Sequence, residues 1–114
     1  MAVRQGDLLQ GTLDLLILRV LTTAPNHGYG IAMRIHQLSK EALRVEEGSL
    51  YPALYRMEEQ GLIVAEWRPT ENNRKAKFYS LTRKGRRAAQ AELEGWRRLS
   101  GAVARVLRAI EQGA

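Results

Sequence analysis

The chain has 114 residues, a length typical of one domain with a hydrophobic core of its own. Hydrophobic residues make up 45% of it and charged residues 26%, as in ordinary globular domains, and the lack of cysteine excludes disulfides, thiolate metal sites and cysteine nucleophiles. The net charge of +6 favours an anionic partner.

The N-terminal part shows no membrane or export signal. Residues 1–10 contain Arg4 and Asp7 and no long apolar run, so we expect no signal peptide. The most apolar stretch, residues 13–21, includes two charged side chains and is too short to span a bilayer, so we expect no membrane partner.

A first helix is predicted over residues 12–23, where apolar residues recur at helical spacing: Leu13, Leu16, Ile17, Val20 and Leu21. Leu15 and Leu18 lie off this stripe, and a helix that is apolar on two sides is buried on two sides. We therefore expect a partner subunit to cover the second side. Residues 25–28 are typical of a turn that ends this helix.

Two more helices follow. The second is predicted over residues 29–39, with an inner face of Ile31, Ala32, Ile35 and Leu38. After a polar connection at residues 40–47, the third is predicted over residues 48–61, with a buried stripe of Leu50, Ala53, Leu54 and Met57. Gly48 and Ser49 suit its start and Gly61 suits its end.

The opposite face of the third helix carries Tyr51, Tyr55 and Arg56. A surface helix with a purely structural role more often shows Lys, Glu and Gln there, so this face is predicted to contact a partner. Two alternatives stay open: Tyr51 could wedge against the following hairpin, and Arg56 could pair with Glu59 or Gln60.

A β-hairpin is predicted next, from strands at residues 62–67 and 77–81 joined by a turn at residues 68–76. Between residues 68 and 87 there are eight basic residues and one acidic residue, so this segment carries +7 and the rest of the chain −1. Arg74, Lys75 and Lys77 at the hairpin tip suit contacts with phosphates. The alternative is a loop tip that only aids solubility.

A long last helix is predicted over residues 83–111, with Thr82 as its N-cap. Its apolar positions approximate a heptad pattern: Ala89, Leu93, Trp96, Leu99, Val103, Val106 and Ile110. Because no later segment of the chain covers them, we expect a symmetric helix–helix homodimer.

These elements predict a mainly α fold with a small β-hairpin: a winged helix-turn-helix at residues 1–82 and a dimerisation helix at residues 83–114. In that layout the second helix braces the third, which enters the DNA major groove. A winged helix that docks a partner protein instead of DNA is the alternative. We expect no catalysis, cofactor or metal, because no nucleophile–base pair, carboxylate dyad, phosphate loop or ligand cluster can be assembled.

Residues 8–112 resemble the PadR-like transcriptional regulators, in the short form with a single C-terminal helix. The most specific runs are GSLYPAL at residues 48–54 and RKAKFYSLTRKG at residues 74–85, with further matches at residues 11–13, 27–31 and 58–63. The resemblance implies a cytoplasmic homodimer, usually a repressor, that binds an inverted-repeat operator in double-stranded DNA. The sequence differs from the family in its wing, which is less densely basic because it also contains Glu71, Asn72, Asn73 and Ala76.

The resemblance also assigns roles to individual residues. Ser49, Tyr51 and Tyr55 would contact DNA from the third helix, Tyr29 would assist from the start of the second, and the wing would contribute Arg74, Lys75 and Lys77. Trp96, with Leu93 and Leu99 beside it, would lie at the dimer interface and sandwich a small planar hydrophobic effector. The alternative is that Trp96 is ordinary dimer core.

Overall fold

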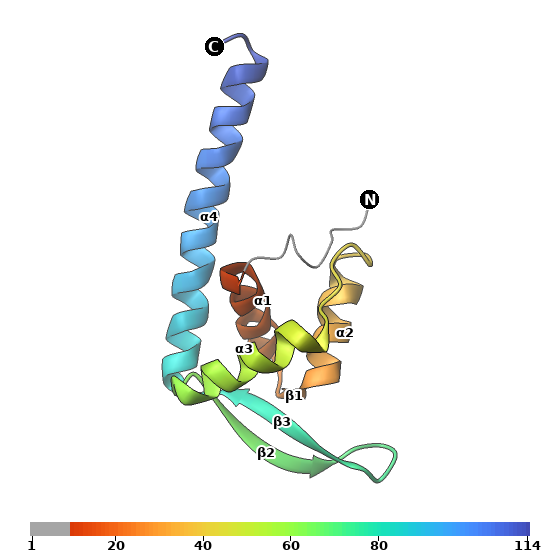
Figure 1. The fold of residues 1–114 in the computed structure, drawn as a ribbon. Helices are drawn as coiled ribbons and strands as arrows, with labels where there is room; N and C mark the ends of the chain where they lie inside the picture. The colour runs from red at the N-terminus through yellow and green to blue at the C-terminus, as the bar shows by residue number, and fades with distance from the viewer. Residues whose placement is uncertain (1–9) are drawn as a thin grey trace.

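The computed structural model describes residues 10–114; residues 1–9, and with them most of the segment predicted not to be a signal peptide, lie outside the described residues. The elements are α1 (Gln10–Thr23), β1 (Asn26–His27), α2 (Gly28–Leu38), α3 (Glu47–Glu59), β2 (Ile63–Pro69), β3 (Lys75–Leu81) and α4 (Arg83–Glu111). Three helices gather over a small sheet, and α4 extends far beyond them (Figure 1). The predicted fold class is confirmed.

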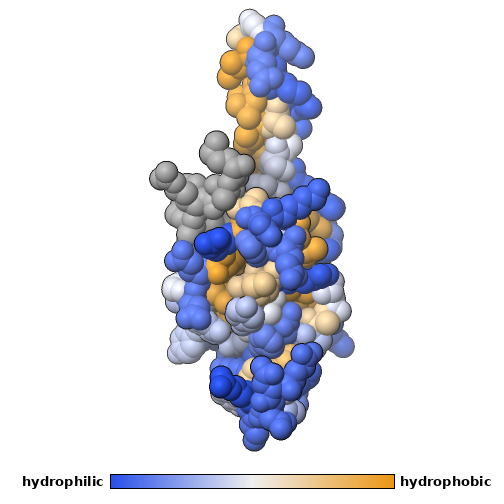
Figure 2. Space-filling view, turned by 90° about the vertical axis from the view of Figure 1, so that its right-hand side faces the viewer, coloured by the Kyte–Doolittle hydropathy of each residue, from blue (hydrophilic) through white to orange (hydrophobic). Residues whose placement is uncertain are grey.

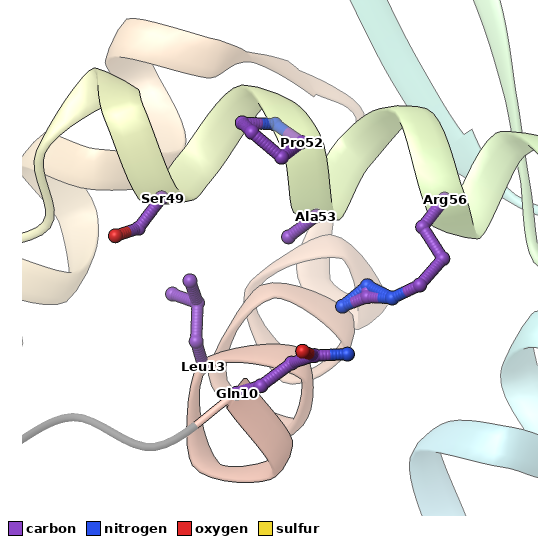
Figure 3. Close-up of a pocket in the computed structure, with 6 residues that line it drawn as sticks. All are labelled: Gln10, Leu13, Ser49, Pro52, Ala53 and Arg56. Atoms are coloured by element: carbon purple, nitrogen blue, oxygen red, sulfur yellow. The ribbon is translucent and has the colours of Figure 1, made fainter.

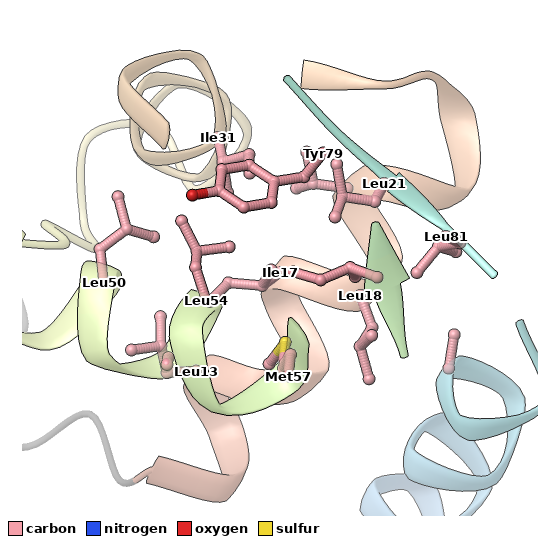
Figure 4. Packing of buried hydrophobic residues seen from close by; sticks show 14 of the residues in the cluster. Leu13, Ile17, Leu18, Leu21, Ile31, Leu50, Leu54, Met57, Tyr79 and Leu81 are labelled. Carbon is pink, nitrogen blue, oxygen red and sulfur yellow. The ribbon is translucent and has the colours of Figure 1, made fainter. Parts of the chain in front are cut away.

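The core lies between α1, α2, α3 and the sheet, and Figure 4 shows it from close by. All four predicted apolar residues of α3 are buried, and they belong to one hydrophobic cluster with Ile17 and Leu18 of α1. Burial of such side chains contributes roughly 1.5–3 kcal/mol each. This packing fixes which face of α3 points inward, and therefore which face is left for a partner.

The prediction that a partner subunit covers the second apolar side of α1 is wrong for the residues that suggested it. Leu15 and Leu18 are both buried within the single chain. The reason is that α1 packs against α4 and β3 as well as against α2 and α3. The chain thus encloses its first helix on several sides without a second copy.

The turn predicted at residues 25–28 also forms a short strand. Asn26 and His27 pair with Tyr79 and Phe78 as β1, so the sheet has three antiparallel strands in the order β1-β3-β2. The predicted hairpin is present with longer strands, and its register runs from Ile63↔Leu81 to Pro69↔Lys75. We call residues 63–81 the wing.

Two details of α2 and α3 differ from the sequence prediction. Leu38 is 63% exposed, although it was assigned to the inner face of α2, because it ends the helix and lines an open groove with Leu16 and Leu43. Helix α3 begins at Glu47, so Ser49 lies within its first turn and not at its cap. Gly61 follows the helix with φ of +75°, a conformation that favours glycine.

A tight junction holds α4 against the start of the wing. Thr82 is the predicted N-cap, and its Oγ1 accepts a hydrogen bond from the Gly85 amide at 3.0 Å. The same hydroxyl donates to the carbonyl oxygen of Gly61 at 2.7 Å. Gly85 comes so close to the Leu62 carbonyl that a Cβ atom would overlap it. Gly85 and Ala89 are buried, so the first turns of α4 share the core of the preceding helices.

Candidate nucleic-acid interface

Helix α3 turns two tyrosines outward. Tyr51 is 44% exposed and Tyr55 67% exposed, on the side opposite the buried stripe. Ser49 lies half-buried at the N-terminal end of the same helix. Exposed tyrosines one turn apart combine an aromatic surface with hydroxyl groups that can donate hydrogen bonds to phosphates or base edges. The structure therefore brings Tyr51 and Tyr55 together on the outer side of α3, whereas Ser49 lies on the side that faces α1, where it borders a cavity with Leu13 and Arg56.

The position of Tyr51 is set by α2. A Cβ atom at Gly28, the first residue of α2, would lie within 3 Å of the Tyr51 hydroxyl oxygen and ring. Tyr51 thus contacts the start of α2, and it also lies near the hairpin: burial raises the pKa of Tyr79 in β3, and the charge of Tyr51 raises it further. The glycine is what lets the ring come this close, and it orients the tyrosine from a rigid element.

Tyr29 stands beside this junction, 67% exposed on the first turn of α2. His27 caps that helix: its Nδ1 accepts a hydrogen bond from the Gly30 amide at 3.0 Å. The imidazole ring stacks with Tyr29 and meets Phe78 of β3 edge-on, with ring centroids 6.4 Å and 5.1 Å apart. This aromatic contact joins the exposed end of α2 to the wing.

The wing tip carries exposed Arg74 and Lys75. A tight turn supports them: the Thr70 amide and hydroxyl both donate to the Arg74 carbonyl oxygen, at 2.7 Å and 2.8 Å. Asn73 adopts φ of +60°, a left-handed conformation that asparagine tolerates well. Both basic side chains are thus presented on a defined loop.

Lys77, which the sequence grouped with the tip, lies lower on the wing. Its Nζ is 3.3 Å from Oε1 of Glu58 in the last turn of α3. It also lies 5.7 Å from the centroid of the Tyr79 ring. The structure therefore places Lys77 on the part of the wing that lies against α3, apart from Arg74 and Lys75 at the tip.

The basic segment predicted over residues 68–87 divides into two places. Arg68, Arg74, Lys75 and Lys77 lie on the wing, whereas the basic residues of the first α4 turns lie at the opposite end of β3 (Figure 1). Arg68 pairs with Glu66 at 3.3 Å and stands over the Phe78 ring. Lys84 donates to the Gln60 carbonyl oxygen at 2.8 Å. The wing tip thus lies beside α2, whereas the basic residues at the start of α4 lie near the C-terminal end of α3.

Arg56 has a different partner from those that the sequence suggested. Its Nη2 donates to Oδ1 of Asp14 in α1 at 2.6 Å, instead of pairing with Glu59 or Gln60. Burial raises the pKa of Asp14, and the hydrogen bond and charge of Arg56 offset this only in part. Arg56 also borders a cavity of about 370 Å³ between α1 and α3, shown in Figure 3 with Ser49 and Gln10.

Helix α4 carries an exposed apolar stripe that continues past the body of the fold: Trp96, Leu99, Val103, Val106, Leu107 and Ile110. Figure 2 shows it as a hydrophobic band along the protruding helix, beside a hydrophilic face. Trp96 and Leu99 also border a cavity of about 450 Å³ against Gly11, Thr12 and Leu15 of α1. Leu93 does not border this cavity and is half-buried.

The residues that the structure describes hold neither a metal-ligand cluster nor a membrane-spanning helix. Across residues 10–114 no three His, Asp or Glu side chains come together as a metal site would require. Within that same range, no helix has the length and apolarity needed to cross a bilayer.

Sequence reasoning missed Asp14 and Gly28 as parts of this region. Asp14 is 42 residues from Arg56, and no local pattern links the two. Gly28 was visible only as part of a turn and of a motif shared with the family. The close spacing of Gly28 and Gly30 was a signal for it, because glycine allows other groups to approach the backbone closely. In the structure a Cβ at Gly30 would likewise overlap a neighbour, the Asn26 side chain.

The helix-turn-helix, its outward tyrosines and the basic wing define a transcriptional regulator of the winged helix-turn-helix class. The chain belongs to the family described as "Transcriptional regulator PadR-like family", whose pattern matches residues 17–91. This is a family of regulators and not of enzymes.

Individual relatives agree with this assignment. A transcriptional regulator of Mycobacterium tuberculosis is 40% identical over 65 residues, which cover 57% of this chain and 59% of that protein. The crystal structure of a PadR-like transcriptional regulator from Bacillus cereus matches with a TM-score of 0.75 and 28% identity, covering 88% of this chain and 95% of that one. A transcriptional regulator from Clostridium thermocellum matches with a TM-score of 0.79 and 25% identity, over 90% and 97% of the two chains.

Proposed function

We propose that two copies of this chain bind an inverted-repeat operator in double-stranded DNA in the cytoplasm and repress the adjacent promoter. The observation that carries the proposal is the exposure of Tyr51 and Tyr55 on α3, beside a wing whose tip presents Arg74 and Lys75. Helix α3 would lie in the major groove, and the wing would contact the flanking backbone. Repression is the usual action in the family that the sequence resembles.

Each predicted contact has a distinct task in this proposal. Tyr51 and Tyr55 reach base edges or inner phosphates, and Ser49 and Tyr29 hydrogen-bond to the backbone at the edge of the groove. Arg74 and Lys75 add a contribution that does not depend on sequence, because they neutralise phosphates and release counterions. Lys77 stands closer to α3, where its ion pair with Glu58 keeps the wing beside the helix.

The two-fold assembly rests on the apolar stripe of α4. Six large apolar side chains exposed along one helix favour a partner helix with the same stripe. Two recognition helices related by a two-fold axis would read two half-sites about one DNA turn apart.

An effector could act at this interface. In the proposed dimer, Trp96 approaches its symmetry mate beside the cavity against α1, and a small planar hydrophobic compound would stack there. Trp67→Phe leaves Trp96 as the single tryptophan, so its fluorescence can be followed directly. Quenching by planar aromatics supports the proposal, and no quenching across a broad panel contradicts it.

The test of DNA binding is a gel shift with the protein's own promoter region at several salt concentrations. Arg74→Ala with Lys75→Ala should weaken binding to all duplexes and reduce the salt slope by about 4, because the two protomers together lose four cations. Arg105→Ala with Arg108→Ala removes the same charge from the far end of α4, and serves as the matched control. Tyr55→Ala should reduce operator binding more than binding to unrelated DNA.

The alternative function, a winged helix that docks a protein partner, gives the opposite result. The wild-type chain would then shift no duplex at physiological salt, and the wing variant would leave any residual binding unchanged. That outcome contradicts the proposed function.

A further inference from the structure

The ion pair between Asp14 and Arg56 joins the recognition helix to α1. The Arg56 Nη2 and the Asp14 Oδ1 are 2.6 Å apart, and the two side chains are only 28% and 23% exposed. Figure 3 shows Arg56 reaching from α3 toward α1, alongside the cavity that the two helices enclose. An ion pair that is this short and largely covered is directional, unlike the apolar contacts around it.

The direction of the Asp14–Arg56 ion pair affects how the outer face of α3 is oriented. The buried stripe seats the helix on the core, but apolar contact alone tolerates small rotations about the helix axis. Arg56 follows Tyr55 in the chain, so fixing the side of α3 on which Arg56 lies also fixes the direction of Tyr55. Each residue is separated from the next by about 100° around the helix.

Helix α1 in turn contacts the dimerisation helix. Leu15, the neighbour of Asp14, borders the cavity that Trp96 and Leu99 line. One helix thus touches both the recognition helix and the apolar face of α4.

We propose that Arg56 is a positioning residue: through Asp14 it fixes the rotation of α3 relative to α1, so that the operator specificity of Tyr51 and Tyr55 depends on this pair. The inference rests on the proposed DNA-binding function. In this role Arg56 contacts α1 within the protein, although its position in the sequence had suggested a contact with a partner.

A direct phosphate contact by Arg56 is the competing role, and a double-mutant cycle separates the two. The variants are Asp14→Asn, Arg56→Gln and the double substitution. The ligands are a duplex selected from a random pool by the wild-type protein and a scrambled duplex of the same composition, each titrated across a range of salt concentrations.

Positioning predicts that either single variant lowers the operator-over-scrambled affinity ratio by about tenfold. The double variant should be no worse than the singles, and the salt slope should not change. A phosphate contact predicts that Arg56→Gln weakens binding to both duplexes alike and lowers the slope by about 2, one for each protomer. It also predicts that Asp14→Asn, which removes a negative charge, strengthens binding to both.

Glu59→Gln is the matched control, because it removes one carboxylate from the exposed surface of α3. It should raise affinity for both duplexes equally and leave their ratio unchanged. Circular dichroism establishes that each variant is folded. Arg56→Lys keeps the charge but not the forked guanidinium geometry. If Arg56 is a positioning residue, this variant should retain part of the wild-type operator-over-scrambled affinity ratio.

The outcomes are distinguishable. A wild-type protein that does not prefer the selected duplex contradicts the proposed function itself. A wild-type preference that survives both Asp14→Asn and Arg56→Gln overturns only this inference, as does additivity of the two substitutions.

Discussion

The side chain of Tyr51 lies against Gly28, so closely that a Cβ atom at residue 28 would stand 2.7 Å from the tyrosine hydroxyl oxygen and 2.8 Å from a ring carbon. A contact this short cannot accommodate a methyl group unless the ring moves. The first residue of α2 therefore decides where an exposed side chain of α3 points. This is a physical form of the bracing that the second helix provides for the third.

Gly28→Ala should therefore displace Tyr51 and weaken operator binding by about tenfold, the effect of losing one good contact. Binding to unrelated DNA should change less, because the wing is untouched. The measurement is a pair of titrations, with the selected duplex and with a scrambled one. In a Tyr51→Ala background Gly28→Ala should have no further effect on binding; an equal loss in both backgrounds would show that it acts by another route.

Two glycine-to-alanine substitutions should have opposite effects on stability. A Cβ at Gly85 would overlap the Leu62 carbonyl oxygen, a backbone atom that cannot rotate away, so Gly85→Ala should lower the free energy of unfolding by about 3 kcal/mol. Gly48 has open space around its Cβ position and lies in α3, so Gly48→Ala should raise it by about 0.5–1 kcal/mol. Urea unfolding at fixed protein concentration measures both. A Gly85→Ala protein as stable as the wild type would contradict the close packing of α4 on the start of β2.

The pH dependence of stability should reveal the net cost of burying Asp14. Its pKa is raised above the ordinary 3.8 because burial disfavours the charged form more than Arg56 favours it. The folded chain thus holds this proton more tightly than the unfolded chain does. The contribution of Asp14 favours folding below pH 3.8, and it is lost as the pH rises through the raised pKa.

Relative to Asp14→Asn, the wild-type protein should therefore lose stability between about pH 3 and pH 7, the range that contains the carboxyl titration. Urea unfolding of both proteins at several pH values across this range measures the difference. A wild type that gains stability relative to Asp14→Asn over the same range would show that the ion pair is net stabilising. The predicted result fits a pair that orients α3 at the expense of some stability.

The apolar stripe of α4 should hold two copies together. Val103→Glu with Val106→Glu places two charges in the stripe and should convert a dimer, with twice the 12.9 kDa chain mass, to a monomer. Arg105→Gln with Arg108→Gln changes the net charge by the same amount on the same helix and should leave the dimer intact. Light scattering at micromolar concentration measures the mass. A wild-type protein of 12.9 kDa would contradict the proposed assembly.

The parts of this fold that sequence predicted are those governed by local pattern. The buried stripe of α3 follows from helical spacing, and the cap at Thr82 follows from a hydroxyl before a long helix. The wing follows from alternating residues around a turn, and Gly61 from the need for a left-handed residue after α3. In each case the sequence signal lies in a short run of neighbouring residues.

The parts that sequence missed depend on distant segments. Asn26 and His27 have turn chemistry, and they become a strand only because β3 offers them a free edge. Helix α1, which carries Leu15 and Leu18, packs against β3 and α4, which come more than fifty residues later. In the sequence alone these apolar side chains therefore indicated a partner subunit to cover them. The pairing of Arg56 with Asp14 likewise requires the packed arrangement of α1 and α3.

The most direct test of the central claim is the stoichiometry and symmetry of the DNA complex. Selection from a random duplex pool gives the symmetry of the bound site. Light scattering during titration of the protein with the selected duplex gives the number of protomers bound. We predict an inverted repeat whose half-site centres lie about 34–36 Å apart, bound by two protomers. Selection that yields no common sequence, or a site without two-fold symmetry bound by one protomer, would contradict the claim.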